Sequence, residues 1–144
     1  MKKVADILKR KGSAVTSIPP GTTVIDALKL MAEQNIGSVM VAEGATFMGI
    51  VTERDYSRKV VLKGRSSTET KVEEIMSVHY PKVNKDDTIE QCMLLLSKNN
   101  IRYLPVFDGE AVTGIVSIND VVKETILSQE ETINSLKDYL HTNM

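Results

Sequence analysis

The sequence predicts an α/β (α+β) fold made of two β-α-β-β-α units that are related by a pseudo-twofold axis. The first observation is a repeat, because Gly49–Asp55 (Gly-Ile-Val-Thr-Glu-Arg-Asp) recurs as Gly114–Asp120 (Gly-Ile-Val-Ser-Ile-Asn-Asp). The second is that the match continues without a gap, so that Asn35-Ile36 aligns with Asn100-Ile101. We expect a first repeat at 1–71, with an N-terminal helix and a linker, and a second at 72–144, with a C-terminal helix. Each repeat alone would bury its apolar surface poorly, so the two are expected to fold as one body.

The first repeat begins with a short strand at Val15–Ile18, followed by a turn at Pro19-Pro20-Gly21. Thr23 then caps a helix that carries Asp26 at its third position. Apolar residues follow a helical spacing and predict one buried face, made by Val24, Ala27, Leu28 and Met31.

Two strands and a further helix complete each repeat. Strands at 38–42 and 47–51 flank a turn at Glu43-Gly44-Ala45, and strands at 103–107 and 111–116 flank Asp108-Gly109. Pro105 has no N–H to donate, so it is expected at a strand start or a sheet edge. The hairpins run into helices at 53–62 and from 118 to about 140.

The second repeat reproduces the first helix, with Thr88 as the cap and Gln91 three positions later. Cys92 aligns with Ala27 and is therefore expected in the core. A linker at 63–70 precedes a short helix at Val72–Met76, which matches residues 4–8 at the start of the chain.

Composition excludes several classes of protein. The net charge of −1 argues against a nucleic-acid binder, which needs a dominant basic patch. No apolar run approaches the roughly 20 residues of a membrane span, and the first residues lack the apolar stretch of a signal peptide. The single cysteine, Cys92, indicates a reducing, cytoplasmic compartment. No catalytic set, metal-ligand cluster or phosphate loop is evident, so we expect neither an enzyme nor a metal requirement.

The last helix carries an apolar stripe, Ile126, Ile133, Leu136 and Leu140, that extends beyond the repeat. Two interpretations stay open. The stripe is either a surface for self-association or a surface that docks on the N-terminal helix of the same chain.

The repeated Thr/Ser-x-x-Asp pattern stands where a strand meets a helix, where free N–H groups and the helix dipole favour anions. An aspartate there can accept hydrogen bonds from both hydroxyls of a ribose. The same spacing, in Thr52/Asp55 and Ser117/Asp120, is also a capping box that stabilises a helix without any ligand. The two roles are compatible.

These segments resemble the CBS domain, a repeat named from cystathionine β-synthase, and two in tandem resemble a CBS pair or Bateman module. The resemblance rests on 15–24, 35–41 and 49–55 and their partners 82–89, 100–106 and 114–120, including Ile101–Val106. It implies a regulatory protein, here a stand-alone CBS-domain protein, that binds adenosine nucleotides in clefts between the repeats. AMP is the foremost expected ligand, with ADP, ATP or NAD as others. It also implies a homodimer and a regulated partner protein.

The resemblance further implies that the Asp of each repeat faces the first two strands of the other. Cleft one would then comprise Thr52, Arg54, Asp55, Tyr80, Pro81, Val83, Arg102 and Tyr103. Cleft two would comprise Ser117, Asn119, Asp120, Thr16, Ile18, Pro19, Gly37 and Ser38. Ile18 or Val83 would cover the face of the adenine.

The two predicted clefts differ in charge. Cleft one has Arg54 and Arg102, and further phosphate contacts are expected from Arg58, Lys59, Arg65, Ser66 and Ser67. We expect it to tolerate several phosphates or a dinucleotide, whereas cleft two would prefer AMP. The alternative is that Arg54, Arg58 and Lys59 form a solvated helix face. The competing function is a protein-interaction or dimerisation module whose nucleotide sites do not function.

Overall fold

The computed structural model describes residues 1–12 and 14–142. These residues form two compact units. The first-repeat unit contains residues 14–80 and 108–113, and the second-repeat unit contains residues 1–12, 81–107 and 114–142. In the described part of the chain, no helix combines the length and the apolar character that crossing a membrane requires.

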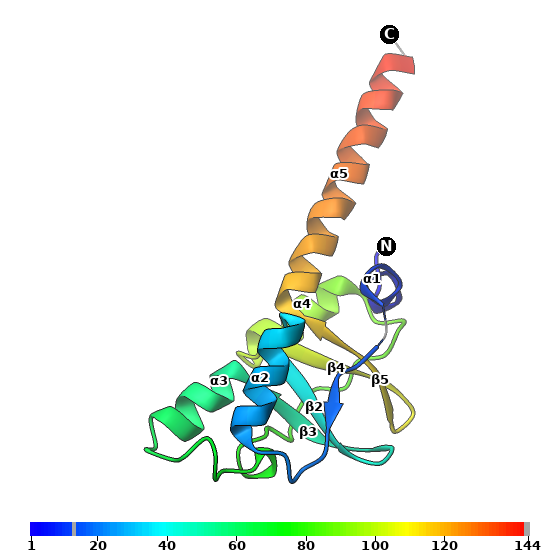
Figure 1. Cartoon of the computed structure of the whole chain (residues 1–144). Helices are drawn as coiled ribbons and strands as arrows, with labels where there is room; N and C mark the ends of the chain where they lie inside the picture. The colour runs from blue at the N-terminus through cyan, green and yellow to red at the C-terminus, as the bar shows by residue number, and fades with distance from the viewer. Residues whose placement is uncertain (13, 143–144) are drawn as a thin grey trace. The chain divides into compact units, whose positions relative to one another are not determined.

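The first-repeat unit is built on the three-stranded sheet β1-β2-β3 (Figure 1). β1 (Ser17–Ile18) is parallel to β2 (Ser38–Glu43), and β2 is antiparallel to β3 (Thr46–Thr52). The helix α2 (Val24–Gln34) packs against β2 through the predicted face, of which Val24, Ala27 and Met31 are fully buried. The Thr23 hydroxyl accepts a hydrogen bond from the Asp26 N–H, as the sequence predicts.

The helix predicted at 53–62 is present but irregular. It begins as α3 (Glu53–Tyr56) and continues as a π-helical segment, Ser57–Val61. The short helix predicted at 72–76 is a 3₁₀ turn over Val72–Glu74. Such changes of helical type are frequent at functional sites and at helix ends, and spacing patterns do not predict them.

The second-repeat unit contains α1 (Val4–Lys11), α4 (Ile89–Lys98), α5 (Ile118–Thr142) and most of β4 (Tyr103–Asp108) and β5 (Ala111–Ser117), without residues 108–113 of these two strands and their turn. Its core is formed by apolar residues of all these elements, among them Val4, Cys92, Leu104, Val116 and Val121. Cys92 is fully buried, which confirms the expectation that it packs in the core. The mixed α/β architecture predicted from the sequence is thus present, with two small sheets.

Pro105 explains why the two sheets differ in size. In the first-repeat unit the N–H of Met40 donates to the carbonyl of Thr16 and extends the β1–β2 pairing. Pro105 stands at the matching position of the second repeat and has no N–H. The parallel pairing there reduces to one bridge between Val83 and Val106. The proline lies inside β4, which is an edge strand of the two-stranded sheet, so the edge position expected for it is confirmed.

The segments that precede the two repeats are exchanged between the units. The N–H groups of Val4 and Ala5 donate to the carbonyls of Asp87 and Lys85, beside the start of α4. In the first-repeat unit, the N–H of Val72 donates to Thr22 and the N–H of Val24 donates to Thr70. Each unit is therefore completed by the segment that precedes the other repeat, and the compact units do not follow the sequence division between residues 71 and 72.

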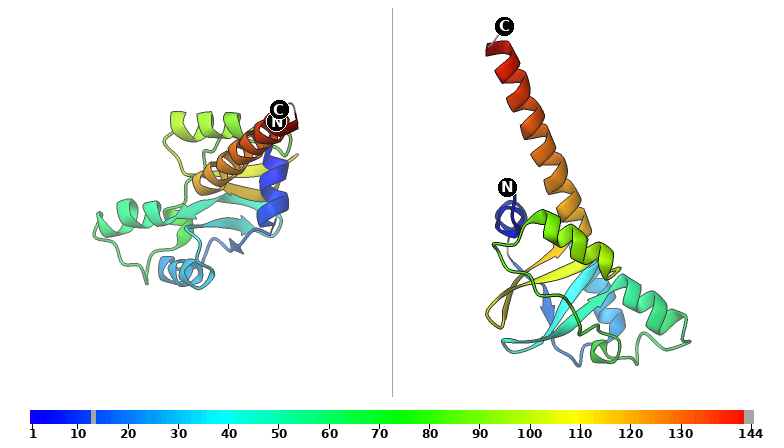
Figure 2. Two further views of the ribbon diagram at one scale, coloured as in Figure 1. Left: turned by 90° about the horizontal axis from the view of Figure 1, so that it is seen from above. Right: turned by 180° about the vertical axis from the view of Figure 1, so that it is seen from behind.

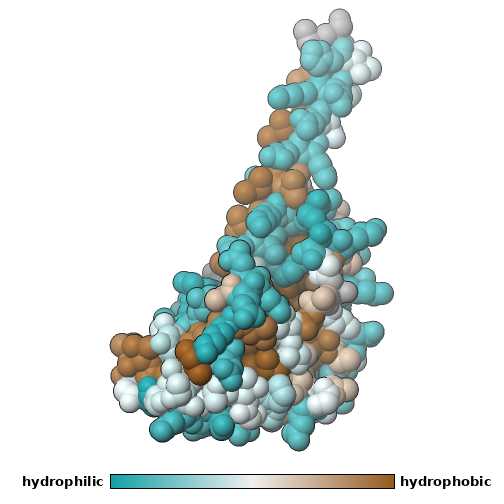
Figure 3. Space-filling view, viewed as in Figure 1, coloured by the Kyte–Doolittle hydropathy of each residue, from teal (hydrophilic) through white to brown (hydrophobic). Residues whose placement is uncertain are grey.

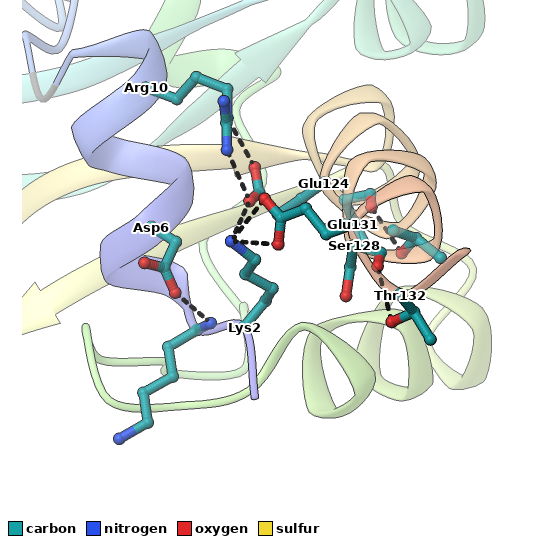
Figure 4. A network of polar contacts seen from close by, with 10 residues as sticks. Lys2, Asp6, Arg10, Glu124, Ser128, Glu131 and Thr132 are labelled. Atoms are coloured by element: carbon teal, nitrogen blue, oxygen red, sulfur yellow. Dashed lines mark hydrogen bonds and ion pairs between the residues drawn. The ribbon is translucent and has the colours of Figure 1, made fainter. Parts of the chain in front are cut away.

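The helix α5 is held to the second-repeat unit by its N-terminal half. Glu124 is buried and forms two hydrogen bonds with the Arg10 guanidinium, at 3.0 and 3.1 Å (Figure 4). Two helical turns further along α5, Glu131 forms an ion pair with Lys2 at 3.3 Å. Beyond Glu131 the described residues of α5 are all exposed, and Figure 2 shows the helix continuing well past α1 and α4.

Candidate functional site: two strand-to-helix corners

The first corner lies where β3 ends and α3 begins, and we call it the Thr52 corner. The Thr52 hydroxyl accepts the N–H of Asp55 at 3.0 Å, and the Asp55 carboxylate accepts the N–H of Thr52, also at 3.0 Å. This reciprocal pair is the capping box that the spacing predicts. Both residues are buried, at 8% and 6% exposure, which favours a single conformation of the corner.

The second corner, which we call the Ser117 corner, has the same geometry where β5 meets α5. The Ser117 hydroxyl accepts the N–H of Asp120 at 3.1 Å, and the Asp120 carboxylate accepts the N–H of Ser117 at 2.8 Å. The repeated sequence motif therefore forms the same local structure twice.

Each carboxylate is also paired with a lysine. Asp55 Oδ1 lies 2.9 Å from Lys59 Nζ and accepts a hydrogen bond from the Ser77 hydroxyl at 3.1 Å. Asp120 Oδ2 lies 2.7 Å from Lys11 Nζ, which also donates to the carbonyl of Ile115. The two lysines come from different places: Lys59 follows Asp55 by one helical turn, whereas Lys11 is on α1.

Sequence reasoning missed Lys11 and Ser77 as neighbours of the two carboxylates. Both residues lie in the exchanged segments, Lys11 before β1 and Ser77 after the 3₁₀ turn. Aligning the two repeats in the sequence therefore does not show that they lie beside the Thr/Ser-x-x-Asp motif. For Lys59 a signal was present, because a lysine four residues after an aspartate on a helix is a known favourable pair. It was predicted as a phosphate contact.

Within each unit, a strand start lies beside the corner. In the first-repeat unit, Ser38 is opposite Thr52 in the β2–β3 register and the carbonyl of Gly37 accepts the N–H of Glu53 at 3.1 Å. In the second-repeat unit, the carbonyl of Arg102 accepts the N–H of Ile118 at 2.9 Å. Gly37-Ser38 and Arg102-Tyr103 therefore lie next to the corner of their own repeat.

The other predicted residues are distributed over both units. Of cleft one, the first-repeat unit holds Thr52, Arg54, Asp55 and Tyr80, and the second-repeat unit holds Pro81, Val83, Arg102 and Tyr103. Of cleft two, the second-repeat unit holds Ser117, Asn119 and Asp120, and the first-repeat unit holds Thr16, Ile18, Pro19, Gly37 and Ser38. Both clefts stay predictions. The side chains expected to cover adenine, Ile18 and Val83, are only 7% and 2% exposed.

The linker residues predicted as extra phosphate contacts have structural partners. Arg65 forms an ion pair with Glu74, and the hydroxyls of Ser66 and Thr68 share a hydrogen bond at 2.9 Å. The carbonyl of Ser67 accepts the N–H of Ile25 at 2.9 Å and so caps the start of α2. Arg58 is exposed on the π-helical segment.

The groups present at the corners are suited to binding a polar ligand. Among the described residues, no group of three or more His, Cys, Asp or Glu side chains is placed to hold a metal ion. Each corner offers a carboxylate, a hydroxyl and the N-terminus of a helix. That combination suits a ligand with hydroxyl groups that donate hydrogen bonds to the carboxylate. The same ligand would carry a neighbouring group that accepts hydrogen bonds from the corner.

Comparison with known proteins agrees with this picture. The family model of the CBS domain matches residues 4–61 and 72–126. The mitochondrial CBS domain-containing protein CBSX3 of Arabidopsis thaliana is 34% identical over 95% of this chain and 71% of its own length.

Solved structures show the same fold. A protein with CBS domains from Burkholderia ambifaria, proposed to act in signal transduction, is 45% identical, with a TM-score of 0.85 over 89% of this chain and 96% of that one. The hexameric CBS-CP12 protein of bloom-forming cyanobacteria is 28% identical, with a TM-score of 0.77 over 96% of this chain and 83% of that one. The resemblance seen in the repeated motif is thereby confirmed, and the chain belongs to the CBS-domain family as a tandem pair of CBS domains.

Proposed function

We propose that this protein is a regulatory module that binds an adenosine nucleotide, AMP foremost and ADP, ATP or NAD as further ligands, and signals to a partner protein through a change of conformation. The observation that carries the proposal is the duplicated corner, in which a carboxylate stands beside a helix N-terminus in both repeats. Membership of the CBS-domain family, together with a relative proposed to act in signal transduction, supports the regulatory role.

The carboxylates would bind the ribose. An ionised carboxylate accepts hydrogen bonds from two vicinal hydroxyls, and each charge-assisted bond contributes roughly 1.5–3 kcal/mol. A ligand that lacks one hydroxyl loses the contribution of that hydroxyl, and a ligand that carries a phosphate on it also adds charge repulsion. We therefore expect 2′-deoxy nucleotides and NADP to bind more weakly than AMP and NAD.

The Ser117 corner is the better candidate for the first ligand. The Asp120 side chain is 17% exposed, compared with 8% for Asp55. Asp55 uses both carboxylate oxygens, on Thr52, Lys59 and Ser77, whereas the contacts described for Asp120, with Ser117 and Lys11, all use Oδ2. A ribose at Asp55 would have to displace more internal hydrogen bonds than a ribose at Asp120.

The sequence predicts that the Thr52 side accepts ligands with several phosphates, but two of its basic side chains already have partners in the protein. Lys59 is held by Asp55 and by the carbonyl of Ile75, and Arg65 is held by Glu74. Phosphate would compete with these partners. Arg54, Arg58 and Arg102 are further candidates for phosphate contacts, and ATP binding by an Asp120→Asn variant tests them.

A thermal-shift panel with AMP, ADP, ATP, NAD, NADP and 2′-deoxy-AMP tests the proposal. A ligand that binds only the native state at about 100 times its Kd adds about 2.7 kcal/mol to the free energy of unfolding. We expect AMP to raise Tm in the wild type, and Asp120→Asn to remove most of this shift. Asp86→Asn is the matched control on an exposed turn. A panel in which no nucleotide raises Tm would favour the alternative, an interaction or dimerisation module with non-functional sites.

The remaining parts of the proposal concern the setting of the protein. We propose a homodimer, a regulated partner protein and no catalytic activity, in keeping with relatives that are named as CBS-domain proteins. A cytoplasmic location is proposed because the one cysteine, Cys92, forms no disulfide. Neither nucleic acid nor membrane is a proposed partner.

A further inference from the structure

The exposed face of α5 has the spacing of a coiled-coil seam. Five apolar residues, each about half exposed, lie along it: Val122 50%, Ile126 49%, Ile133 51%, Leu136 58% and Leu140 57%. In a heptad numbering, Ile126, Ile133 and Leu140 occupy position a, and Val122, Gln129 and Leu136 occupy position d. The seam is therefore apolar at five of six consecutive core positions, and Figure 3 shows apolar residues along one edge of α5.

This seam is not the face that packs on the rest of the second-repeat unit. Glu124 and Glu131 occupy position f, and they face α1 through Arg10 and Lys2. Position f lies on the opposite side of a helix from the a/d seam. The part of the seam from Ile133 onward also lies beyond the matched CBS-domain segment, which ends at residue 126. Family membership therefore does not explain it.

We propose that the C-terminal part of this seam, from Gln129 to Leu140, binds the same part of a second copy of the chain in an antiparallel two-helix contact. A symmetric dimer needs a surface that is complementary to itself, and an antiparallel helix pair has the twofold symmetry that this requires. The contact specifies a surface for the homodimer proposed above and does not depend on nucleotide binding.

Charge selects the register. The e positions are Lys123, Glu130 and Lys137. In an antiparallel pair with Ile133 opposite Leu136 of the second copy, Glu130 faces Lys137 of the second copy, and the symmetric pair forms as well. If the contact is shifted by one heptad toward the N-terminus, Glu130 faces Glu130 of the second copy and Lys123 faces Lys137 of the second copy. If the contact is shifted by one heptad toward the C-terminus, Lys137 faces Lys137 of the second copy. Only the first register joins opposite charges.

A parallel pair gains nothing from these charges. In a parallel coiled coil, position g of one helix faces position e of the next heptad of the other. The g residues Thr125 and Thr132 would then face Glu130 and Lys137, which forms no ion pair. Gln129 would also meet its own copy in the core. The antiparallel arrangement instead places Gln129 against Leu140 at the edge of the contact.

Sedimentation equilibrium of the full chain tests the proposal. We expect a dimer whose Kd rises at least a hundredfold, toward a monomer, in Leu136→Glu. Ser135→Glu, which adds the same charge at an exposed position outside the seam, is the matched control and should leave Kd unchanged. Circular dichroism of each variant reports whether the helix is intact.

A charge-swap series tests the register. Glu130→Lys and Lys137→Glu each replace two attractive pairs by two repulsive ones, so each alone should weaken the dimer by about tenfold. The double variant restores both attractions and should recover the wild-type Kd. Equal Kd values for all three variants would overturn the antiparallel register.

A wild-type dimer that Leu136→Glu leaves intact would place the dimer contact elsewhere, and a monomeric wild type would exclude the contact. The nucleotide panel reads out the proposed function independently in each case.

Discussion

Leu8 lies directly against Gly114, so that a Cβ atom at position 114 would come within 2.7 Å of Leu8 Cδ2. The first-repeat unit contains the equivalent contact, in which Met76 and the carbonyl of Ser77 lie over Gly49. A Cβ atom at position 49 would lie 2.8 Å from that carbonyl oxygen and 3.1 Å from Met76 Cγ. The glycines of the repeated Gly-Ile-Val motif thus admit the exchanged segments onto the strands.

This contact predicts unequal effects of two alanine substitutions. Gly49→Ala should lower the free energy of unfolding by about 2 kcal/mol or more, because its methyl group meets backbone that is fixed in the β3 pairing. Gly114→Ala should cost less, since the Leu8 side chain can change rotamer. Urea unfolding measures both. Gly21→Ala, which meets nothing within 4 Å, is the control. In a double-mutant cycle Leu8→Ala should relieve most of the cost of Gly114→Ala.

The Glu124 carboxylate is predicted to be the most important charge for attaching α1. It is 1% exposed and paired with Arg10, so Arg10→Ala leaves a buried carboxylate without its bidentate partner. We expect a lower free energy of unfolding, with a larger loss than in the control variant described next. The control is Glu131→Gln, which removes an exposed ion pair with Lys2 and should cost less than about 0.5 kcal/mol. The prediction fails if the two variants unfold at the same urea concentration.

Cys92 is predicted to be unreactive in the native protein. Burial raises the pKa of its thiol to about 11, from 9.0, because the thiolate loses its hydration in the core. Ellman's reagent at pH 8 should therefore react slowly until guanidinium unfolds the chain, whereas an added cysteine in Ser97→Cys should react at once. Because the folded pKa is the higher one, this thiol favours folding fully below pH 9 and loses that contribution as the pH rises through about 11. Rapid labelling of native wild type would contradict the prediction.

The Glu74 carboxylate predicts a pH dependence of stability on the acid side. The N–H of Lys71 donates to Glu74 Oε2 at 2.7 Å, and this hydrogen bond together with Arg65 lowers the pKa of Glu74. A lowered folded pKa contributes stability above the unfolded value of 4.5, and this stability is lost as the pH falls through the folded value. Glu74→Gln should therefore lower Tm at pH 7 and have little effect at strongly acidic pH. A Tm difference that is the same at both pH values would refute this; Glu73→Gln is the control.

Local patterns predicted much of the fold. The caps at Thr23 and Thr88, both hairpins and the extent of the last helix all follow from residues that are close in sequence, where turn chemistry and periodicity act. The capping geometry of Thr52/Asp55 and Ser117/Asp120 was predicted for the same reason. Of the two places expected for Pro105, a strand start or a sheet edge, the structure has the edge, because β4 belongs to a two-stranded sheet.

Contacts between distant segments were not predicted. In the repeated motif, equivalent residues are separated as Gly49 is from Gly114. The residues that cover these two glycines, Leu8 and Met76, are three positions further apart in the sequence. Alignment of the repeats relates the two leading segments to each other but does not show on which repeat each of them packs. This is why Lys11 and Ser77 were not predicted as neighbours of Asp120 and Asp55.

The exchange of leading segments also sets an order of events during synthesis. The first-repeat unit has its covering segment, residues 70–76, as soon as the ribosome has passed the linker. By contrast, α1 leaves the ribosome before both repeats and must wait for residues 81–121 before its apolar face has a partner. Closing that long loop is slow and leaves Val4 and Ile7 exposed meanwhile. The newly made chain thus depends on its own second half to protect its first helix.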